Sequence, residues 1–270
     1  MSFRCEHLSK SFAMRDGFVQ AIDDITFTVR DGEFVSIVGP SGCGKTTLLK
    51  LITGLLQPSA GSVVFDTAEE NGRPASALVF QEHGLFPWMT VLENVAFGLE
   101  TRGVARTERQ ERAMAFIASV GLGPFADAFP HQLSVGMRQR VGIARAFVTD
   151  PRLLLMDEPL GSLDAQTRLL LQEELLRLWT RSRSSVVYVT HDIEEAVLLG
   201  DRVLVLTGRP GRIQGEITVP LGRPRRLEYA TNPDVGAIKW QVWKMLEQDA
   251  RRSLSMSSTE AASSEAPAAP

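Results

Sequence analysis

The sequence predicts an α/β fold with a mainly parallel sheet, an antiparallel β subdomain near the N-terminus and a helical insert subdomain. Short apolar runs end at turn residues and alternate with helical patterns, which is typical of a parallel sheet covered on both faces. The segment 19–33 instead alternates apolar and polar residues and ends in Asp-Gly, which favours antiparallel strands. Residues 88–150 hold helical patterns and no good strand, so we expect the helical insert there.

The expected elements follow in chain order after the antiparallel segment. Apolar runs predict buried strands at 34–39, 153–159, 185–191 and 202–208, with a further strand-like run at 77–80. The helical patterns cover Val91–Arg102, Thr107–Val120, a stretch that begins after "LSVG" (133–136), and Ala165–Arg181.

The chain divides into one expected domain and a C-terminal extension. We expect the domain at 3–232, with its helical insert at about 88–150, followed by a C-terminal helix at 233–252. The tail 253–270 is rich in Ser and Ala and holds few large apolar groups. Such a segment has too little apolar surface to bury, so we expect it to be disordered.

Composition excludes several classes of protein. The 270 residues carry a net charge of −3, which gives no sign of a general nucleic-acid binder. The two cysteines, Cys5 and Cys43, lie far apart, so a disulfide framework is not expected and a reducing cytosol fits. The sequence shows neither a signal peptide nor the roughly 20 consecutive apolar residues of a spanning helix. Membrane association through a partner stays open.

The stretch "GPSGCGKTT" (39–47) predicts a phosphate-binding loop, and with it a P-loop NTPase core. It follows an expected strand, precedes a helical pattern and fits G-x-x-x-x-G-K-[ST]. Glycines let the backbone curl so that successive N–H groups point at phosphate oxygens. Lys45 is expected to reach the β- and γ-phosphates, and the Thr46 hydroxyl to ligate Mg²⁺. The alternative, a plain Gly-rich turn, explains less of the pattern. The loop residues expected to bind nucleotide are Gly39, Pro40, Ser41, Gly42, Cys43, Gly44, Lys45, Thr46 and Thr47.

Two carboxylates follow the apolar strand "LLLM" and predict the hydrolytic machinery. Asp157 at the strand end can hold Mg²⁺ through water, and Glu158 can act as the general base on the attacking water. Adjacent carboxylates at the mouth of an apolar strand are costly unless a cation or a proton compensates them. A merely polar strand end is the alternative, and it fits poorly beside a phosphate-binding loop.

Two more polar residues are expected at the same edge of the sheet. His191 ends the strand "VVYVT" and can hydrogen-bond the γ-phosphate and orient the water. Gln81 follows the run 77–80 and can contact Mg²⁺ and water, as a third metal-site residue with Thr46 and Asp157. Taken alone, each of these residues would be an ordinary strand-end residue.

The stretch "LSVGMRQR" (133–140) predicts a helix start that offers a hydroxyl and unpaired backbone N–H groups. Helix N-termini favour anions because their first N–H groups have no partner in the helix and the dipole is positive there. A bulky valine, Val135, stands between Ser134 and Gly136.

Together, "GPSGCGKTT", Gln81, "LSVGMRQR", "LLLMDEP", "GSLDA" (161–165) and His191 resemble, in this order, the nucleotide-binding subunit of ABC transporters. The resemblance covers roughly residues 3–220. It implies that two copies pack head to tail around two ATP molecules, with Mg²⁺. Ser134 and the Gly136 backbone would then contact the γ-phosphate held by the other copy's Lys45, and Phe12 would stack on adenine. The family pattern is Leu-Ser-Gly-Gly, and Val135 departs from it. The second glycine is retained, so we expect a working site.

A finer resemblance points to importers of nitrate, sulfonate and taurine. This resemblance rests on three segments, "QEHGLFPWMTVLENVAFGLE" (81–100), "THDIEEAVLLGDRVLVL" (190–206) and "RPGRI" (209–213). It implies an ATPase at the cytoplasmic face of the inner membrane, held there by transmembrane permease subunits and served indirectly by a solute-binding protein. A groove for a permease helix is expected at Phe86, Trp88, Met89 and Val91, although core packing of these side chains is the alternative.

Two other functions compete with this one. A soluble ABC ATPase acting on nucleic acid or ribosomes usually has two cassettes or a long coiled coil, whereas this chain has one cassette and no heptad run. A P-loop kinase or GTPase leaves "LSVGMRQR" and "GSLDA" unexplained. We therefore expect no nucleic-acid partner. The transported solute is not readable from the sequence.

Overall fold

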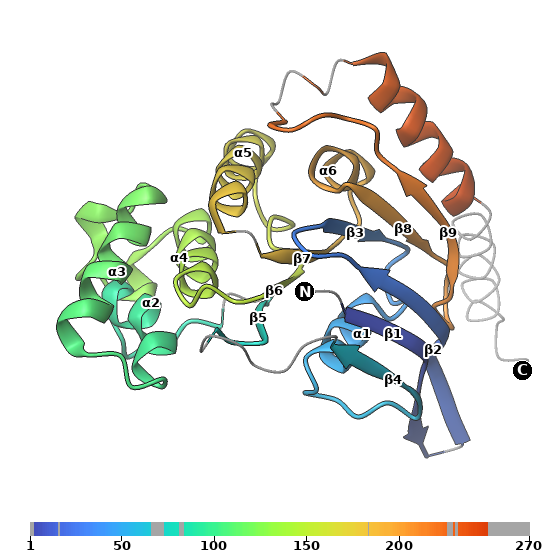
Figure 1. Cartoon of the computed structure of the whole chain (residues 1–270), viewed down its shortest axis with the longest axis horizontal. Coiled ribbons are helices and arrows are strands. Elements are labelled where there is room, and N and C mark those ends of the chain that lie inside the picture. The colour runs from blue at the N-terminus through green and yellow to red at the C-terminus, as the bar shows by residue number, and fades with distance from the viewer. Residues whose placement is uncertain are drawn as a thin grey trace, which may run out of the picture.

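The computed structural model describes residues 3–15, 17–65, 73–80, 84–182, 184–225, 229 and 232–247. Its centre is a six-stranded sheet in the order β5-β6-β7-β3-β8-β9, in which the first five strands are parallel and β9 is antiparallel (Figure 1). The strands are β3 Phe34–Val38, β5 Ser76–Val79, β6 Leu153–Asp157, β7 Ser185–Thr190, β8 Arg202–Leu206 and β9 Ile213–Thr218. The mainly parallel sheet of the sequence prediction is confirmed.

The central strands β3, β6, β7 and β8 are buried along their whole length because helices cover both faces of the sheet. In β3, Val35 and Ile37 pack in one cluster with α1, Lys45–Ile52. Phe34 faces the other way, in a cluster with α5, Ala165–Ser182, and Val38 packs with α6, Ile193–Leu199. Successive residues of a strand point to opposite faces, so a strand buried on both faces is mostly apolar and does not alternate with polar residues.

A second sheet confirms the antiparallel β subdomain. It has the order β2-β1-β4, with β1 Phe3–Met14, β2 Gly17–Val29 and β4 Ala60–Phe65, all antiparallel. Its inner side chains, such as Phe3 and Phe27, share the apolar cluster that includes α1. This packing holds the ends of β1 and β2 beside the loop that precedes α1.

The helical insert is confirmed and lies at one side of the molecule (Figure 1). It contains α2 Val91–Glu100, α3 Arg106–Ser119 and α4 Val135–Phe147. A capping box starts α2: the Thr90 hydroxyl accepts a hydrogen bond from the Glu93 amide at 3.2 Å, and the Glu93 carboxylate accepts one from the Thr90 amide at 2.8 Å.

The expectation that Val91 lines an exposed groove is wrong. This side chain is fully buried in the core of the insert, where it packs among α2, α3 and α4. Trp88 does lie on the surface with 69% of its area exposed, and Phe86 and Met89 are half-buried beside it.

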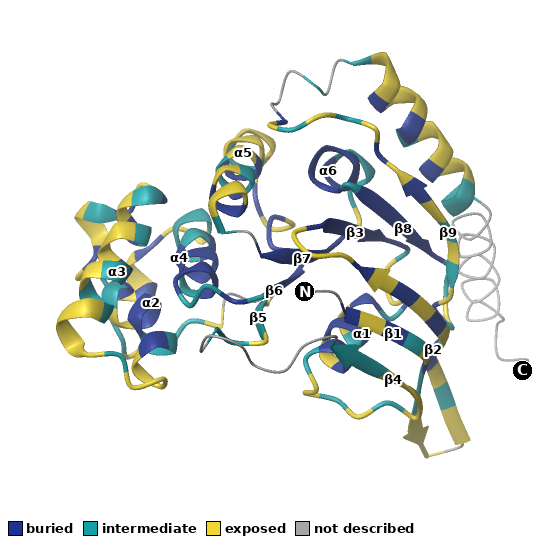
Figure 2. Ribbon diagram, viewed as in Figure 1, coloured by how far each residue is buried: buried dark blue, intermediate teal, exposed yellow. Residues whose placement is uncertain are grey.

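Helical residues also run from 233 to 247 and cross the outer side of β9 (Figure 1). Figure 2 shows one buried stripe on this helix and exposed residues on its outer side. The buried residues Val235, Ile238 and Val242 join the cluster formed with α6, β8 and β9. Residues 248–252 of the expected helix and the expected tail 253–270 lie outside the described residues. Within the part of the chain that the structure describes, no helix is long and apolar enough to cross a membrane.

Candidate functional site

The carboxyl ends of four parallel strands bring the predicted site residues to one edge of the sheet. Residues 39–44 follow β3, Asp157 ends β6, His191 follows β7, and the turn 207–212 follows β8. Since β3 lies between β7 and β8, the phosphate-binding loop is central. Ligands of open α/β sheets bind at this edge.

The conformation of the loop before α1 requires glycine. Gly42 and Gly44 have φ values of +75° and +101°, and a Cβ on Gly44 would lie 2.8 Å from the Ala21 carbonyl oxygen. The helix begins at Lys45, which is 5% exposed. Its Nζ donates to the carbonyls of Gly39 and Pro40 at 2.9 and 3.0 Å. The loop therefore fixes a buried cation at the N-terminus of a helix, a place that favours phosphate.

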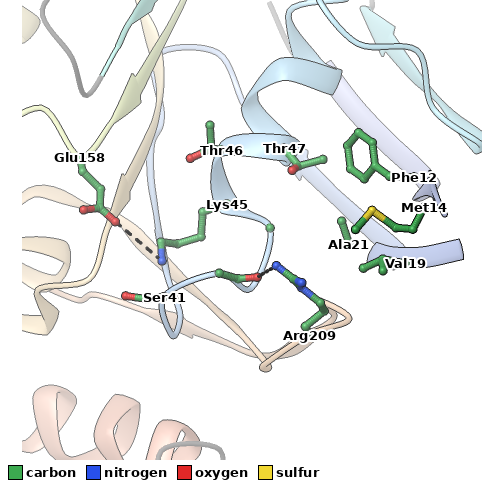
Figure 3. A pocket seen from close by; sticks show the side chains of 12 residues that line it. Phe12, Met14, Val19, Ala21, Ser41, Lys45, Thr46, Thr47, Glu158 and Arg209 are labelled. Atoms are coloured by element: carbon green, nitrogen blue, oxygen red, sulfur yellow. Dashed lines mark hydrogen bonds and ion pairs between the residues drawn. The ribbon is translucent and has the colours of Figure 1, made fainter. Parts of the chain in front are cut away.

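A pocket of about 520 Å³ opens beside this loop (Figure 3). It gathers most of the residues predicted to bind nucleotide: Phe12, Ser41, Gly42, Gly44, Lys45, Thr46, Thr47 and Glu158. Gly39, Pro40 and Cys43 belong to the loop but do not line the pocket. The Cys43 side chain is buried.

The pocket also contains residues that the sequence analysis missed. Met14, Val19 and Ala21 come from β1 and β2, and Arg209 comes from the turn after β8. The motif "RPGRI" and its position after a parallel strand were the available signals for Arg209. No signal distinguished Met14 or Val19 from other strand residues.

Asp157 and Thr46 supply hard oxygen donors that fit Mg²⁺. Asp157 is 5% exposed and forms a hydrogen bond with the Thr46 hydroxyl. Burial raises the pKa of the Asp157 carboxyl, an effect that the Thr46 hydrogen bond and the Lys45 charge only partly offset. A buried carboxylate of this kind is stabilised by a divalent cation. Gln81, the third expected metal-site residue, lies outside the described residues.

Glu158 lies at the centre of the polar groups. Its Oε2 is 2.9 Å from Nδ1 of His191, and its Oε1 is 3.8 Å from Nζ of Lys45. Its backbone has a φ of +45°, an uncommon value for a non-glycine residue, and its amide donates to the Val189 carbonyl at 2.9 Å. The structure thus brings together the predicted base, histidine and lysine from three separate strands.

A buried acid supports the segment that carries His191. Glu195 is 2% exposed and accepts a hydrogen bond from the Thr190 hydroxyl, next to His191 in the chain. Gln172 donates to the same carboxyl group at 3.3 Å, and burial raises the pKa of Glu195. Asp192 caps α6 by accepting from the amides of Glu194 and Glu195 at 2.9 and 3.1 Å. These bonds fix the backbone around His191, whose side chain stays exposed.

The predicted helix start at Ser134 is present and lies apart from the pocket. The Ser134 hydroxyl caps α4 by accepting from the Met137 amide at 3.3 Å. Val135 is the first residue of the helix, has no positive φ and is 41% exposed. Ser134 and Gly136 are absent from the pocket lining. A β-branched residue fits this backbone without strain.

The site can hold a nucleoside triphosphate and activate water. Backbone N–H groups and Lys45 can bind phosphate oxygens, hard oxygen donors suit Mg²⁺, and a carboxylate beside an imidazole can accept the proton of an attacking water. This combination fits hydrolysis of a phosphoanhydride bond.

Comparisons with known proteins agree with this chemistry. The family model described as ABC transporter matches residues 22–161. An uncharacterized ABC transporter ATP-binding protein of Methanocaldococcus jannaschii is 50% identical over 226 residues, covering 83% of this chain and 85% of the relative. The taurine import ATP-binding protein of Rhizobium johnstonii is 45% identical, with 87% and 89% of the two chains covered. The nitrate import ATP-binding protein of Synechocystis is 46% identical, with 82% and 84% covered.

A solved structure supports the same assignment. The dimeric post-hydrolysis state of an ATP-binding cassette bound to ADP and Pi has a TM-score of 0.73 and 32% identity, covering 82% of this chain and all of that chain. The family match and the near-full-length relatives confirm the resemblance drawn from the sequence. The chain belongs to the ABC transporter family, as an ATP-binding subunit whose ATPase activity is coupled to transport.

Proposed function

We propose that two copies of this chain pack head to tail around two ATP molecules and energise import of a small solute through a separate permease. One observation supports this arrangement: the Ser134 helix start is exposed and lies outside the pocket lined by Lys45 and Glu158. A second copy would therefore supply Ser134 and the Gly136 backbone to the γ-phosphate. The similar solved cassette is a dimer bound to ADP and Pi, which supports a dimeric arrangement.

In the proposed cycle, each residue acts on a different part of the nucleotide. Lys45 and the loop amides bind the β- and γ-phosphates, and the adenine lies against Phe12. Asp157 and Thr46 would hold Mg²⁺, which neutralises charge on the transferred phosphoryl group. Glu158 accepts the proton of the attacking water, and His191, 2.9 Å from Glu158, orients that carboxylate and the γ-phosphate.

Mixed dimers test the shared site. Lys45→Ala damages the half of each composite site that the phosphate-binding loop supplies, and Ser134→Arg damages the half that the start of α4 supplies. Each variant alone should be inactive. When the two variants are mixed 1:1, about half of the dimers contain one copy of each variant. Each of these mixed dimers has one intact site and one site damaged on both sides. The ATPase activity of the mixture should therefore return to roughly a quarter of the wild-type level. No recovery on mixing would show that one chain holds the whole site.

The permease and the solute are proposed from different evidence. Trp88, with 69% of its area exposed on the insert, is the main candidate for contact with a permease helix. The relatives named for taurine and nitrate import favour taurine, nitrate, a sulfonate or a related small solute. We place the subunit at the cytoplasmic face of the inner membrane through that contact.

Membrane fractionation with and without the permease subunits tests the location. The chain should sediment with membranes only when the permease is present. Identifying the solute bound by the partner binding protein tests the cargo. A chain that stays in the soluble fraction with its permease present, or that sediments with ribosomes, would contradict the transport role.

A further inference from the structure

The turn between β8 and β9 is hydrogen-bonded to β2 and packs closely against the phosphate-binding loop. The Gly211 amide donates to the Ala21 carbonyl at 2.9 Å, and the Gly211 carbonyl accepts from the Asp23 amide at 3.0 Å. A Cβ on Gly211 would lie 2.1 Å from the Cys43 carbonyl oxygen, so only glycine allows this approach. Arg212 forms an ion pair with Asp23 on the same side. The turn is therefore a fixed wall of the site.

This turn places Arg209 in the pocket. The Arg209 side chain is exposed, lines the pocket and donates from Nη2 to the Gly42 carbonyl at 3.3 Å. Figure 3 shows Lys45 on the Glu158 side of the loop and Arg209 on the side of Ala21 and Val19. The two cations thus face different parts of whatever occupies the pocket.

Arg209 has no carboxylate partner in the part of the chain that the structure describes. Arg202 and Arg212 each pair with a carboxylate, whereas none of the ion pairs found among the described residues includes Arg209. A guanidinium has five N–H donors in a planar fork. Its one bond to a neutral carbonyl leaves donors for an anionic ligand.

We propose that Arg209 is a nucleotide-binding residue that donates hydrogen bonds to the α-phosphate and the ribose. This portion of ATP joins the base, beside Phe12, to the β- and γ-phosphates, beside Lys45. The assignment rests on the proposal that this pocket binds ATP. Because the contact is remote from the γ-phosphate, it strengthens binding of ATP and ADP alike and leaves the chemical step unchanged.

Isothermal titration calorimetry of the full chain with unmodified ATP and ADP tests the proposal, since a ribose label would occupy the proposed contact. Arg209→Gln should weaken the binding of ATP and of ADP to the same extent, by about 10- to 150-fold, which is the range for hydrogen bonds to a charged group. The KM for ATP should rise in parallel while kcat stays constant. Arg106→Gln, which removes an exposed arginine at the start of α3, should leave both affinities unchanged.

Two outcomes would overturn the assignment. Unchanged affinity for both nucleotides in Arg209→Gln would leave the residue with the Gly42 contact alone. Weakened ATP binding with normal ADP binding would show that Arg209 contacts the γ-phosphate or the partner subunit instead. Lys45→Ala serves as the reference: if it weakens ATP binding while Arg209→Gln does not, only the Arg209 assignment fails. If neither variant weakens binding, the pocket itself is not the nucleotide site. Thermal unfolding without nucleotide should give the same midpoint for Arg209→Gln and the wild type.

Discussion

Replacing Glu158 by glutamine separates ATP binding from hydrolysis. The substitution keeps the size and the hydrogen-bonding capacity of the side chain but removes the group that accepts a proton from water. The contact with His191 Nδ1, 2.9 Å from Glu158 Oε2, can persist through the amide oxygen. Loss of a general base costs about 10²–10⁴-fold in rate, or roughly 3–5.5 kcal/mol in the barrier.

The same substitution should strengthen ATP binding. Glu158 Oε1 lies 3.8 Å from the Lys45 ammonium, which is expected to contact the γ-phosphate. The carboxylate and the phosphate then lie on the order of 5 Å apart, where two like charges repel by about 3 kcal/mol at an effective dielectric constant near 20. The attraction between Glu158 and Lys45 exists with and without ATP, so it cancels to first order. Screening by water and Mg²⁺ reduces the expected gain in affinity to at most about tenfold.

Three measurements follow from this argument. Phosphate release should fall by the stated factor, calorimetric affinity for ATP should be equal or higher, and size-exclusion chromatography with ATP should show a persistent dimer. Lys45→Ala is the matched control, because it should lose both affinity and hydrolysis. Hydrolysis by Glu158→Gln within about threefold of the wild-type rate would refute the role of Glu158 as base. A monomer in the presence of ATP would refute the proposed trapping of the dimer.

Three further predictions concern the ionisation of Asp157, the contact of Trp88 with the permease and the role of Val135 at the start of α4. Burial raises the pKa of Asp157 above its ordinary value of 3.8. Ionised Asp157 therefore lowers the free energy of unfolding, and this destabilisation is present at neutral pH. Without Mg²⁺ or nucleotide, Asp157→Asn should therefore raise the unfolding midpoint at pH 8, with a gain that shrinks as the pH falls through the raised pKa toward 3.8. A constant gain would point to a cause other than ionisation. Trp88→Ala should weaken assembly with the permease while nucleotide affinity stays nearly unchanged; reduced thermal stability with normal assembly would favour a packing role. Val135→Gly should change steady-state turnover in the assembled transporter little, and should cost about 0.5–1 kcal/mol in stability through a more flexible chain. A gain in turnover of about tenfold or more would contradict this expectation and show that Val135 lowers the rate of hydrolysis.

The sequence predicted the parts of this fold that are buried on both sides or carry a fixed motif. The runs that became β3, β6, β7 and β8 are mostly apolar and fully buried because helices cover both faces of the sheet. The strand β9 was missed because its sequence, "IQGEIT", is partly exposed at the edge of the sheet and mixes polar with apolar residues. Val91 was misassigned because the sequence pattern of an apolar residue at a helix start does not distinguish a position in the core from one in a surface groove.

The arrangement of polar side chains around Glu158 could be predicted only in part. The order of motifs placed Lys45, Glu158 and His191 at one edge, yet no spacing rule gives the 2.9 Å contact between Glu158 and His191, which are 33 positions apart. The support of the His191 segment by Glu195 was also invisible, since a glutamate in the first turn of a helix usually faces solvent. Such contacts depend on how separate strands pack, which local patterns do not encode.

The position of β3 has a consequence for biosynthesis. This strand carries the phosphate-binding loop, yet its two neighbours in the sheet are β7 and β8, with Phe34 paired to Val186 and Val35 to Arg202. A ribosome that has released the first half of the chain has thus made the loop but neither strand that borders it. Pairing of this kind across about 150 residues is slow to form, because the long intervening segment must first be closed into a loop. The ATP site is consequently among the last features of the nascent chain to mature, and nucleotide binding can stabilise only a chain whose synthesis has passed β8.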